Sequence, residues 1–221
     1  MYLVSSKKIK EYINSNRRDF SNKPFNKEMA HDDPIKQYER WFEEALESKI
    51  LDPYAACLST VDFEGRPSSR ILYIRDISKN GFIFYTNFNS KKGNDLNKNK
   101  YGSLNVFWPD LERQIRIQGV IEKVNNSTSD KYFNARPRSS QIGAWASNQS
   151  ENLHNRAELE AKIEFFKKKF KNIEVPRPPH WGGYCLVPFL MEFWQGRPSR
   201  LHDRIVYKKE SNKWIKSRLS P

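Results

Sequence analysis

The segment Glu192-Phe-Trp-Gln-Gly-Arg-Pro-Ser-Arg-Leu-His-Asp-Arg204 carries the strongest structural signal in this chain. An apolar run ends within it, and Gly196 and Pro198 then mark a turn. The residues that follow, 200–207, alternate in character with a period of two, which predicts a β-strand. The segment therefore predicts two strands joined by a short turn.

Basic side chains gather on one face of the second predicted strand, namely Arg200, His202 and Arg204. The other face carries Leu201, Asp203 and Ile205. Because neighbouring cations repel one another, this pattern favours an anion in front of them, either a phosphate or a cofactor that becomes anionic during turnover. A solvated basic edge strand, which resists aggregation, explains the same pattern. The segment alone leaves both interpretations open.

Length and composition favour a globular protein without a membrane span. The 221 residues, 37% apolar and 14% aromatic, suffice for one packed domain with extensions or for two small ones. The mean hydropathy is −0.85, and no run approaches about 18 apolar residues. The apolar part of residues 1–8 is too short for a signal peptide, and Cys57 and Cys185 give neither a metal-binding spacing nor a disulfide framework. We therefore expect a cytoplasmic protein without a metal site.

The net charge of +13 admits several classes of partner. Nucleic acid, an acidic surface and phosphorylated small molecules would each attract such a chain. Much of the lysine lies in residues 89–100 and 167–171, and runs of this kind are usually solvated surfaces. Charge alone therefore does not choose among these partners.

The order of the predicted elements indicates an antiparallel β structure with flanking helices. A helix begins at Asp33-Pro34, where Asp33 can cap it. Two further helices are expected, one ending near residue 134 and one capped by Ser150 and extending to about residue 170. Strands are expected near residues 54–61, 68–75, 81–87, 103–108, 114–124, 183–194, 200–207 and 214. Strands that mostly follow one another favour a barrel or sandwich over a parallel sheet.

The chain divides into two parts in this interpretation. Residues 1–30 show no clear periodicity beyond one possible short helix, so we expect a partly mobile N-terminal extension. Residues 31–221 are then the folded domain, and they include the C-terminal strands.

Motifs narrow the chemistry. No Gly-x-Gly-x-x-Gly follows a strand, and neither Gly-x-x-x-x-Gly-Lys-Ser/Thr nor His-Glu-x-x-His occurs. Asn89-Ser-Lys-Lys92 follows a strand at a predicted helix start, which suits a phosphate but also an ordinary capped surface helix. The strand at Gln114 can contact the edge of a heterocycle or face water. The loop expected over residues 139–150 can cover the core or line a ligand pocket.

Several of these segments together resemble the pyridoxine (pyridoxamine) 5′-phosphate oxidase family. The matching segments are Arg70-Ile-Leu-Tyr-Ile, Phe84-Tyr-Thr-Asn, Leu111-Glu-Arg-Gln, Tyr132-Phe-x-x-Arg-Pro-Arg-x-Ser-Gln-Ile-Gly-Ala-Trp-Ala-Ser-x-Gln-Ser150, Trp181-Gly-Gly and the stretch from Glu192 to Arg204. The resemblance implies a β-rich α+β fold, the FMN-binding split β-barrel, which is a Greek-key antiparallel barrel with flanking helices. It also implies a homodimer with FMN at the subunit interface.

The resemblance further implies roles for individual residues. The FMN contacts would be Arg70, Ile71, Leu72, Tyr73, Ile74, Arg75, Tyr85, Thr86, Ser90, Lys91, Lys92, Gln114, Gln149, Ser150, Trp194 and Arg204. The substrate contacts would be Arg17, Arg18, Arg75, Tyr132, Arg136, Ser140, Arg200, Leu201 and His202, with Arg200 and His202 as the catalytic pair over the pyridine ring. Three positions depart from the family pattern, because Arg75 replaces a usual Lys, Lys91 a common Arg and Phe20 a Tyr.

The implied activity is that of a pyridoxal 5′-phosphate synthase in vitamin B6 metabolism. Pyridoxamine or pyridoxine 5′-phosphate would pass a hydride from C4′ to FMN, dioxygen would be the acceptor, and hydrogen peroxide, with ammonia from the amine, would leave. A flavin-binding relative without oxidase activity and a basic nucleic-acid-binding β-barrel remain alternatives. The latter typically interleaves aromatic and basic residues on exposed strands, whereas the aromatics here mostly alternate inward. We therefore expect neither nucleic acid nor a membrane as a partner.

Overall fold

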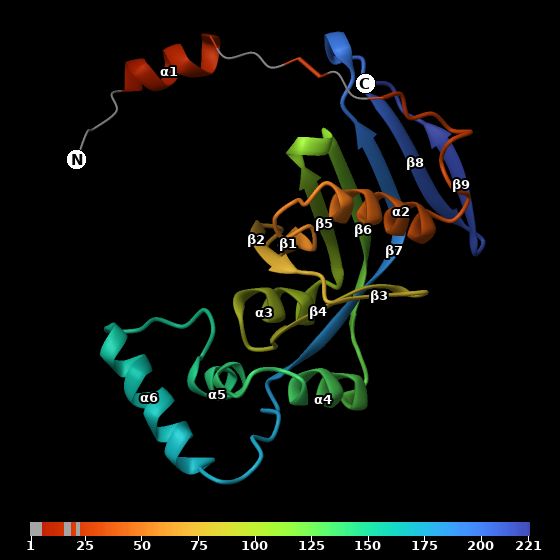
Figure 1. Cartoon of the computed structure of the whole chain (residues 1–221). Helices are drawn as coiled ribbons and strands as arrows, with labels where there is room; N and C mark the ends of the chain where they lie inside the picture. Colours follow the sequence, from red (N-terminus) through yellow and green to blue (C-terminus); the bar gives the residue numbers. More distant parts are fainter. Residues whose placement is uncertain (1–5, 16–18, 21–22) are drawn as a thin grey trace.

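A computed structural model describes residues 6–15, 19–20 and 23–221. Within these residues, nine strands form one curled antiparallel sheet that helices flank (Figure 1). The strands are β1 (Ala55–Val61), β2 (Pro67–Tyr73), β3 (Asp76–Ser78), β4 (Gly81–Asn87), β5 (Tyr101–Trp108), β6 (Arg113–Lys123), β7 (Trp181–Gln195), β8 (Asp203–Glu210) and β9 (Lys213–Arg218). The helices are α1 (Ser6–Ser15), α2 (Pro34–Glu47), α3 (Lys91–Lys98), α4 (Asn126–Asn134), α5 (Arg138–Ala146) and α6 (Arg156–Lys169). No helix in this part of the chain is long and apolar enough to cross a membrane.

The 15-residue strand β7 connects the two ends of the sheet. Strand β6 pairs along most of its length, whereas β4 pairs with residues 181–186 and β8 with residues 190–195. Between these two pairings lies Pro188, which has no N–H to donate to a ladder. The register of β6 shifts opposite it, where a Cβ on Gly119 would lie 2.3 Å from the carbonyl oxygen of Val187. Pro188 and Gly119 thus allow β7 to pair with β4 near its start and with β8 near its end without interruption of the strand.

Helix α2 crosses the sheet (Figure 1) and contributes Ile35, Tyr38, Trp41 and Ala45 to the main core. Asp33 caps it and Pro34 occupies its first turn, which confirms the predicted helix start. Trp41 is almost fully buried, with its ring 5.2 Å from that of Phe193 on β7 and 4.8 Å from that of Phe25. Burial of such rings is the main source of stability for this layer.

A second, smaller core lies between the start of β7 and helices α4, α5 and α6, which gather at that end of the strand (Figure 1). Its buried members are Phe133, Ile142, Phe170, Val175 and Trp181. Two predictions were wrong here. The loop expected over residues 139–150 is mostly helix α5, whose Gln141 amide donates to the carbonyl oxygens at the end of α4. The longer helix begins at Arg156 behind an Asn155 cap, because Ser150 has a left-handed φ of 77° that does not start a helix.

The strand predicted over residues 200–207 begins only at Asp203. Pro198 opens a 3-10 turn, which the N–H of Leu201 closes by donating to the Pro198 carbonyl oxygen at 3.1 Å. Arg200 lies in this turn with a φ of 61°, so it is not on the strand face where it was expected. Leu201 lies at the end of the turn, before the strand, and is 68% exposed.

We expect Trp41→Ala to lower the free energy of unfolding by about 3–5 kcal/mol, because it removes a buried ring between α2 and β7. Urea-induced unfolding followed by circular dichroism measures this change. Glu43→Ala, on the exposed side of the same helix, is the matched control and should change the free energy by less than about 0.5 kcal/mol. A loss below about 1 kcal/mol for Trp41→Ala would contradict the packing described above.

Candidate active site

A cleft of about 1090 Å³ lies between β2, β4, the start of α3, and helices α4 and α5. The predicted ligand contacts that line it are Arg70, Ile71, Leu72, Tyr73, Arg75, Tyr85, Thr86, Lys91, Lys92, Tyr132, Arg136, Ser140, Gln149 and Ser150. Asn87, Ser147 and Trp181 line it as well, although no ligand contact was predicted for them. Ile74, a predicted contact, packs in the main core instead.

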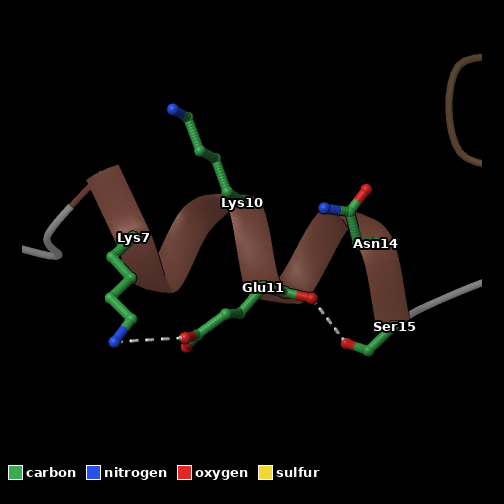
Figure 2. Close-up of a pocket in the computed structure, with 5 residues that line it drawn as sticks. All are labelled: Lys7, Lys10, Glu11, Asn14 and Ser15. Atoms are coloured by element: carbon green, nitrogen blue, oxygen red, sulfur yellow. Dashed lines mark hydrogen bonds and ion pairs between the residues drawn. The ribbon is translucent and has the colours of Figure 1, made fainter.

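Another hollow, of about 650 Å³, lies along the surface of helix α1 (Figure 2). Its lining residues are Lys7, Lys10, Glu11, Asn14 and Ser15. Lys7 and Glu11 form an ion pair at 4.0 Å, and the Ser15 hydroxyl donates to the Glu11 carbonyl oxygen at 2.8 Å. These groups come from a single helix and do not converge on a common point, so we treat this hollow as a helix surface.

Lys92 is a buried cation of the cleft, with 8% of its surface exposed. Its ammonium donates to Thr86 Oγ1 at 3.2 Å, to Ser90 Oγ at 3.1 Å and to Gln149 Oε1 at 3.3 Å. All three acceptors are neutral. Burial, followed by repulsion from Arg70, lowers the pKa of Lys92 to about 8. An anion in the cleft would stabilise this ammonium.

Local packing at the start of α3 places Lys92 in the cleft. The Ser90 hydroxyl caps the helix by accepting from the Gly93 N–H, and donates to the carbonyl oxygen of Asn87 at 2.7 Å. A Cβ on Gly93 would lie 1.9 Å from the carbonyl oxygen of Phe88, so only glycine allows the helix to begin this close to the end of β4. The predicted helix start at these residues is therefore confirmed.

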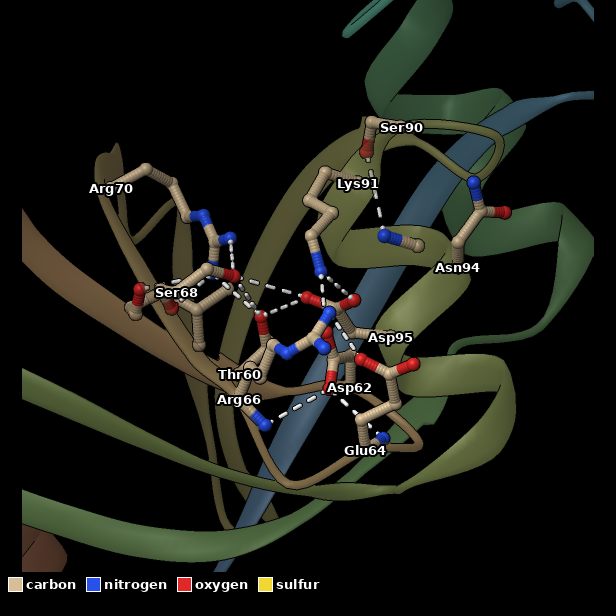
Figure 3. A network of polar contacts seen from close by, with 12 residues as sticks. Thr60, Asp62, Glu64, Arg66, Ser68, Arg70, Ser90, Lys91, Asn94 and Asp95 are labelled. Carbon is tan, nitrogen blue, oxygen red and sulfur yellow. Dashed lines mark hydrogen bonds and ion pairs between the residues drawn. The ribbon is translucent and has the colours of Figure 1, made fainter.

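Arg70 on β2 is the second cation (Figure 3). Its Nη1 donates to the Thr60 hydroxyl at 2.8 Å, and its Nη2 donates to the Ser68 hydroxyl at 2.6 Å. Nη1 also donates hydrogen bonds to the carbonyl oxygens of Leu58 and Ser68. Burial lowers the pKa of Arg70, and its charge acts on Lys92 across the same cleft. The two cations thus face one ligand volume.

Aromatic rings and a third cation form another part of the lining. The rings of Tyr85 and Tyr132 stack 3.7 Å apart, and the Arg136 guanidinium lies 4.5 Å from the centre of the Trp181 ring. Burial lowers the pKa of Arg136, and its Nη1 has no hydrogen-bond acceptor among the described residues. Because an unsatisfied buried donor is costly, an anion in the cleft would stabilise this guanidinium.

Six further predicted contacts lie at the other end of β7. They are Gln114, Trp194, Arg200, Leu201, His202 and Arg204. Gln114 is paired with Trp194 between β6 and β7, and the rings of Trp194 and His202 lie 4.6 Å apart. His202 Nδ1 accepts from the N–H of Arg197 at 3.2 Å, and burial lowers the pKa of His202. Phe20 packs edge-on against Trp194 and His202.

Arg204 already has a counter-ion within the chain. Its Nε donates to Glu192 Oε1 at 2.8 Å, and its Nη1 donates to the carbonyl oxygen of Ser220 at 2.8 Å. Glu192 is 3% exposed and also accepts from Arg116 at 3.0 Å. The cationic repulsion expected here therefore does not by itself require a ligand, because a buried carboxylate offsets it.

One copy of the chain presents these two groups as separate half-sites. Among the described residues, the cleft lining includes none of the group around Trp194. Trp181 in the cleft and Trp194 stand at opposite ends of β7, roughly 40 Å apart along the strand at about 3.3 Å per residue. Arg17 and Arg18, which were predicted as substrate contacts, lie outside the described residues.

The fold agrees with comparisons to known proteins. An FMN-binding, pyridoxamine 5′-phosphate oxidase-related protein from Nostoc punctiforme superposes with a TM-score of 0.68 at 15% identity, over 86% of this chain and 98% of its own. The structure of PhzG from Burkholderia lata 383 in complex with tetrahydrophenazine-1-carboxylic acid superposes with a TM-score of 0.85 at 31% identity, over 91% of this chain and 100% of its own. The fold is thus the FMN-binding split β-barrel, as expected from the sequence.

Sequence comparison identifies the family within this fold. The pyridoxamine 5′-phosphate oxidase model matches residues 42–169, and the model of the pyridoxine 5′-phosphate oxidase C-terminal dimerisation region matches residues 181–221. A pyridoxine/pyridoxamine 5′-phosphate oxidase of Actinobacillus pleuropneumoniae serotype 3 is 49% identical over 93% of this chain and 97% of its own length. One of Neisseria meningitidis serogroup B is 46% identical over the same shares. The chain belongs to the pyridoxamine 5′-phosphate oxidase family and is an enzyme of that class.

The lowered pKa of Lys92 predicts a pH dependence of stability for the protein without ligands. The pKa of Lys92 is about 8 in the folded chain and has its ordinary value of 10.5 in the unfolded chain. Between these two pH values the unfolded chain therefore binds more protons than the folded chain. The free energy of unfolding of the wild type, relative to Lys92→Met, should therefore rise as the pH increases from about 8 to 10. Urea titrations across this range measure the difference. Lys98→Met, exposed on the same helix, is the control, and a flat or falling difference for Lys92→Met would contradict the assignment.

Proposed function

We propose that this chain is an FMN-dependent oxidase that converts pyridoxamine 5′-phosphate and pyridoxine 5′-phosphate to pyridoxal 5′-phosphate. Dioxygen is the acceptor and hydrogen peroxide is released, and with the amine substrate water hydrolyses the resulting imine to the aldehyde and ammonia. The observation that carries this proposal is one cleft with two incompletely neutralised cationic centres, Lys92 with Arg70 and, separately, Arg136. A phosphorylated cofactor and a phosphorylated substrate bring one anion to each centre.

The residues around Lys92 fit the phosphate of FMN. Lys92 and Arg70 supply positive charge, the hydroxyls of Thr86 and Ser90 lie beside the ammonium, and the first turn of α3 adds main-chain donors. A phosphate here would replace neutral oxygens as the partner of a buried ammonium. The sequence carries no dinucleotide motif, which favours FMN over FAD.

The residues around Arg136 fit the phosphate of the substrate. A guanidinium binds phosphate through two parallel N–H donors, and the hydroxyls of Tyr132 and Ser140 line the same cleft. Arg75 lines the cleft too, with its guanidinium 4.8 Å from the centre of the Tyr73 ring. Arginine cannot lose its proton here as the usual lysine can, so we assign Arg75 a fixed charge that attracts the substrate phosphate.

The chain's own residues would bind and orient the reactants, while bound FMN would supply the hydride acceptor for oxidation at C4′. Arg200 and His202 orient the C4′ substituent, and Arg204 lies near the flavin. Because His202 Nδ1 accepts from the Arg197 N–H, the neutral imidazole carries its proton on Nε2. His202 therefore presents a hydrogen-bond donor to the ligand, and its lowered pKa favours this neutral form near pH 7.

A complete site requires a second copy of the chain. The two half-sites lie at opposite ends of β7, and the C-terminal region resembles the family's dimerisation region. A second copy could cover an apolar face of β2 and β5. On this face, Ile71, Tyr101 and Phe107 are 68%, 62% and 55% exposed and lie on one side of the sheet. We therefore propose a homodimer in which each FMN contacts both subunits.

The proposed activity belongs to residues 31–221, with residues 1–30 as an extension. Phe25 and Ala30 pack into the main core, so the extension is attached to the domain at its end.

The purified protein should be yellow and should take up oxygen when pyridoxamine 5′-phosphate is added. Heat-released cofactor should migrate as FMN on chromatography, because the helix-start cradle suits one terminal phosphate. Recovery of mainly FAD, or no flavin binding after addition of FMN, would contradict the assigned cofactor. Flavin binding without oxygen uptake would favour the alternative of an inactive flavin-binding relative.

Arg136→Ala should weaken binding of pyridoxamine 5′-phosphate while leaving the affinity for FMN unchanged. Loss of a charge-assisted phosphate contact costs about 1.5–3 kcal/mol, which is roughly ten- to more than a hundredfold in affinity. Substrate titration and flavin titration measure the two affinities separately. Arg138→Ala is the matched control, because Arg138 donates to the carbonyl oxygens of Phe170 and Ile173. Equal losses for both ligands in Arg136→Ala would show that this residue is misplaced.

A further inference from the structure

We propose that Ser68, with Thr60 and the buried carboxylate of Asp95, positions the Arg70 guanidinium to receive the cofactor phosphate (Figure 3). These three residues have no assigned ligand contact and reach the cofactor only through Arg70. The inference rests on the proposed function, because it takes FMN as the ligand at Arg70.

Asp95 uses both carboxylate oxygens within this network. Its Oδ1 accepts from the Lys91 ammonium at 2.7 Å, one helical turn earlier on α3. Its Oδ2 accepts from the Thr60 hydroxyl at 2.7 Å and from the Ser68 hydroxyl at 3.1 Å. Asp95 is 3% exposed, so these donors are its stabilising partners in place of water.

The carboxylate determines how the two hydroxyls present themselves to Arg70. A hydroxyl has one proton to donate, and an ionised carboxylate only accepts. With their protons directed at Asp95, Thr60 and Ser68 turn lone pairs toward the guanidinium, which donates to them at 2.8 and 2.6 Å. The guanidinium is thereby fixed before any ligand arrives, which lowers the entropic cost of binding one.

Lys91 is committed to the same network. Besides Asp95 at 2.7 Å, its ammonium lies 3.5 Å from Asp62, whose carboxylate accepts from the N–H groups of Glu64 and Arg66 in the β1–β2 turn. The common family residue at this position is Arg, which would be expected next to the flavin phosphate. Here the charge of Lys91 is directed at two carboxylates, so the phosphate depends more on Arg70 and Lys92.

The test is FMN binding to the flavin-free protein, followed by quenching of flavin fluorescence. Ser68→Ala removes one hydrogen bond to Arg70 without changing the net charge, so a long-range electrostatic effect is excluded. We expect the dissociation constant for FMN to rise about tenfold. Riboflavin, which lacks the phosphate, should bind Ser68→Ala and wild type equally well. Ser69→Ala is the matched control, because the Ser69 hydroxyl pairs with Ser59 at 2.8 Å instead, and it should leave FMN binding unchanged.

A double-mutant cycle with Arg70→Ala distinguishes positioning from a general structural role. If Ser68 acts through Arg70, Ser68→Ala should have no further effect on FMN binding in the Arg70→Ala background. An unchanged FMN affinity in Ser68→Ala, an equal loss for riboflavin, or an additive loss in the double variant would overturn the inference. Failure of the wild-type chain itself to bind FMN would show that the proposed cofactor is wrong. Equal FMN binding by the wild type and Ser68→Ala would instead overturn only the positioning role of Ser68.

Discussion

Strand β7, which pairs with β4 through residues 181–186 and with β6 through residues 184–195, is the constraint on which the rest of the molecule depends. It holds the cationic cleft at the Trp181 end and the Trp194–His202 pair at the other end, roughly 40 Å apart along one strand. Among the described residues, the cleft of a single copy includes none of the Trp194 group, which supports the proposal that one ligand contacts both half-sites only in a dimer. A second copy, arranged by two-fold symmetry, can place each half-site against its complement twice.

Within the cleft, function follows from positive charge that the chain leaves only partly neutralised. Lys92 has neutral oxygens as partners, and Arg136 keeps a buried donor without an acceptor among the described residues. Other cations have carboxylate partners, as Arg204 has in Glu192 and Lys91 has in Asp95. This contrast, more than the net charge, supports the proposed phosphate sites.

The sequence predicted local features well and long-range partners poorly. The start of α2 at Asp33 and of α3 at Ser90 depends on capping groups within a few residues, which are visible in the sequence. The turn at Arg200 depends on Pro198 outweighing an alternating pattern. The pairing of Ser68 with Asp95 joins residues far apart in the chain, and no spacing rule reveals it. Most of the predicted site residues were inferred from the family resemblance, and their roles remain predictions.

The central claim, that each site is shared between two subunits, is tested most directly by mixing two inactive variants. Lys92→Met removes a cleft residue, and Arg200→Ala removes a residue of the other half-site. Refolded together in equal amounts, they should form mixed dimers that contain one intact site each, and oxygen uptake with pyridoxamine 5′-phosphate should recover to about a quarter of the wild-type value. Activity that stays at the level of the two separate variants would show that each subunit forms its site alone.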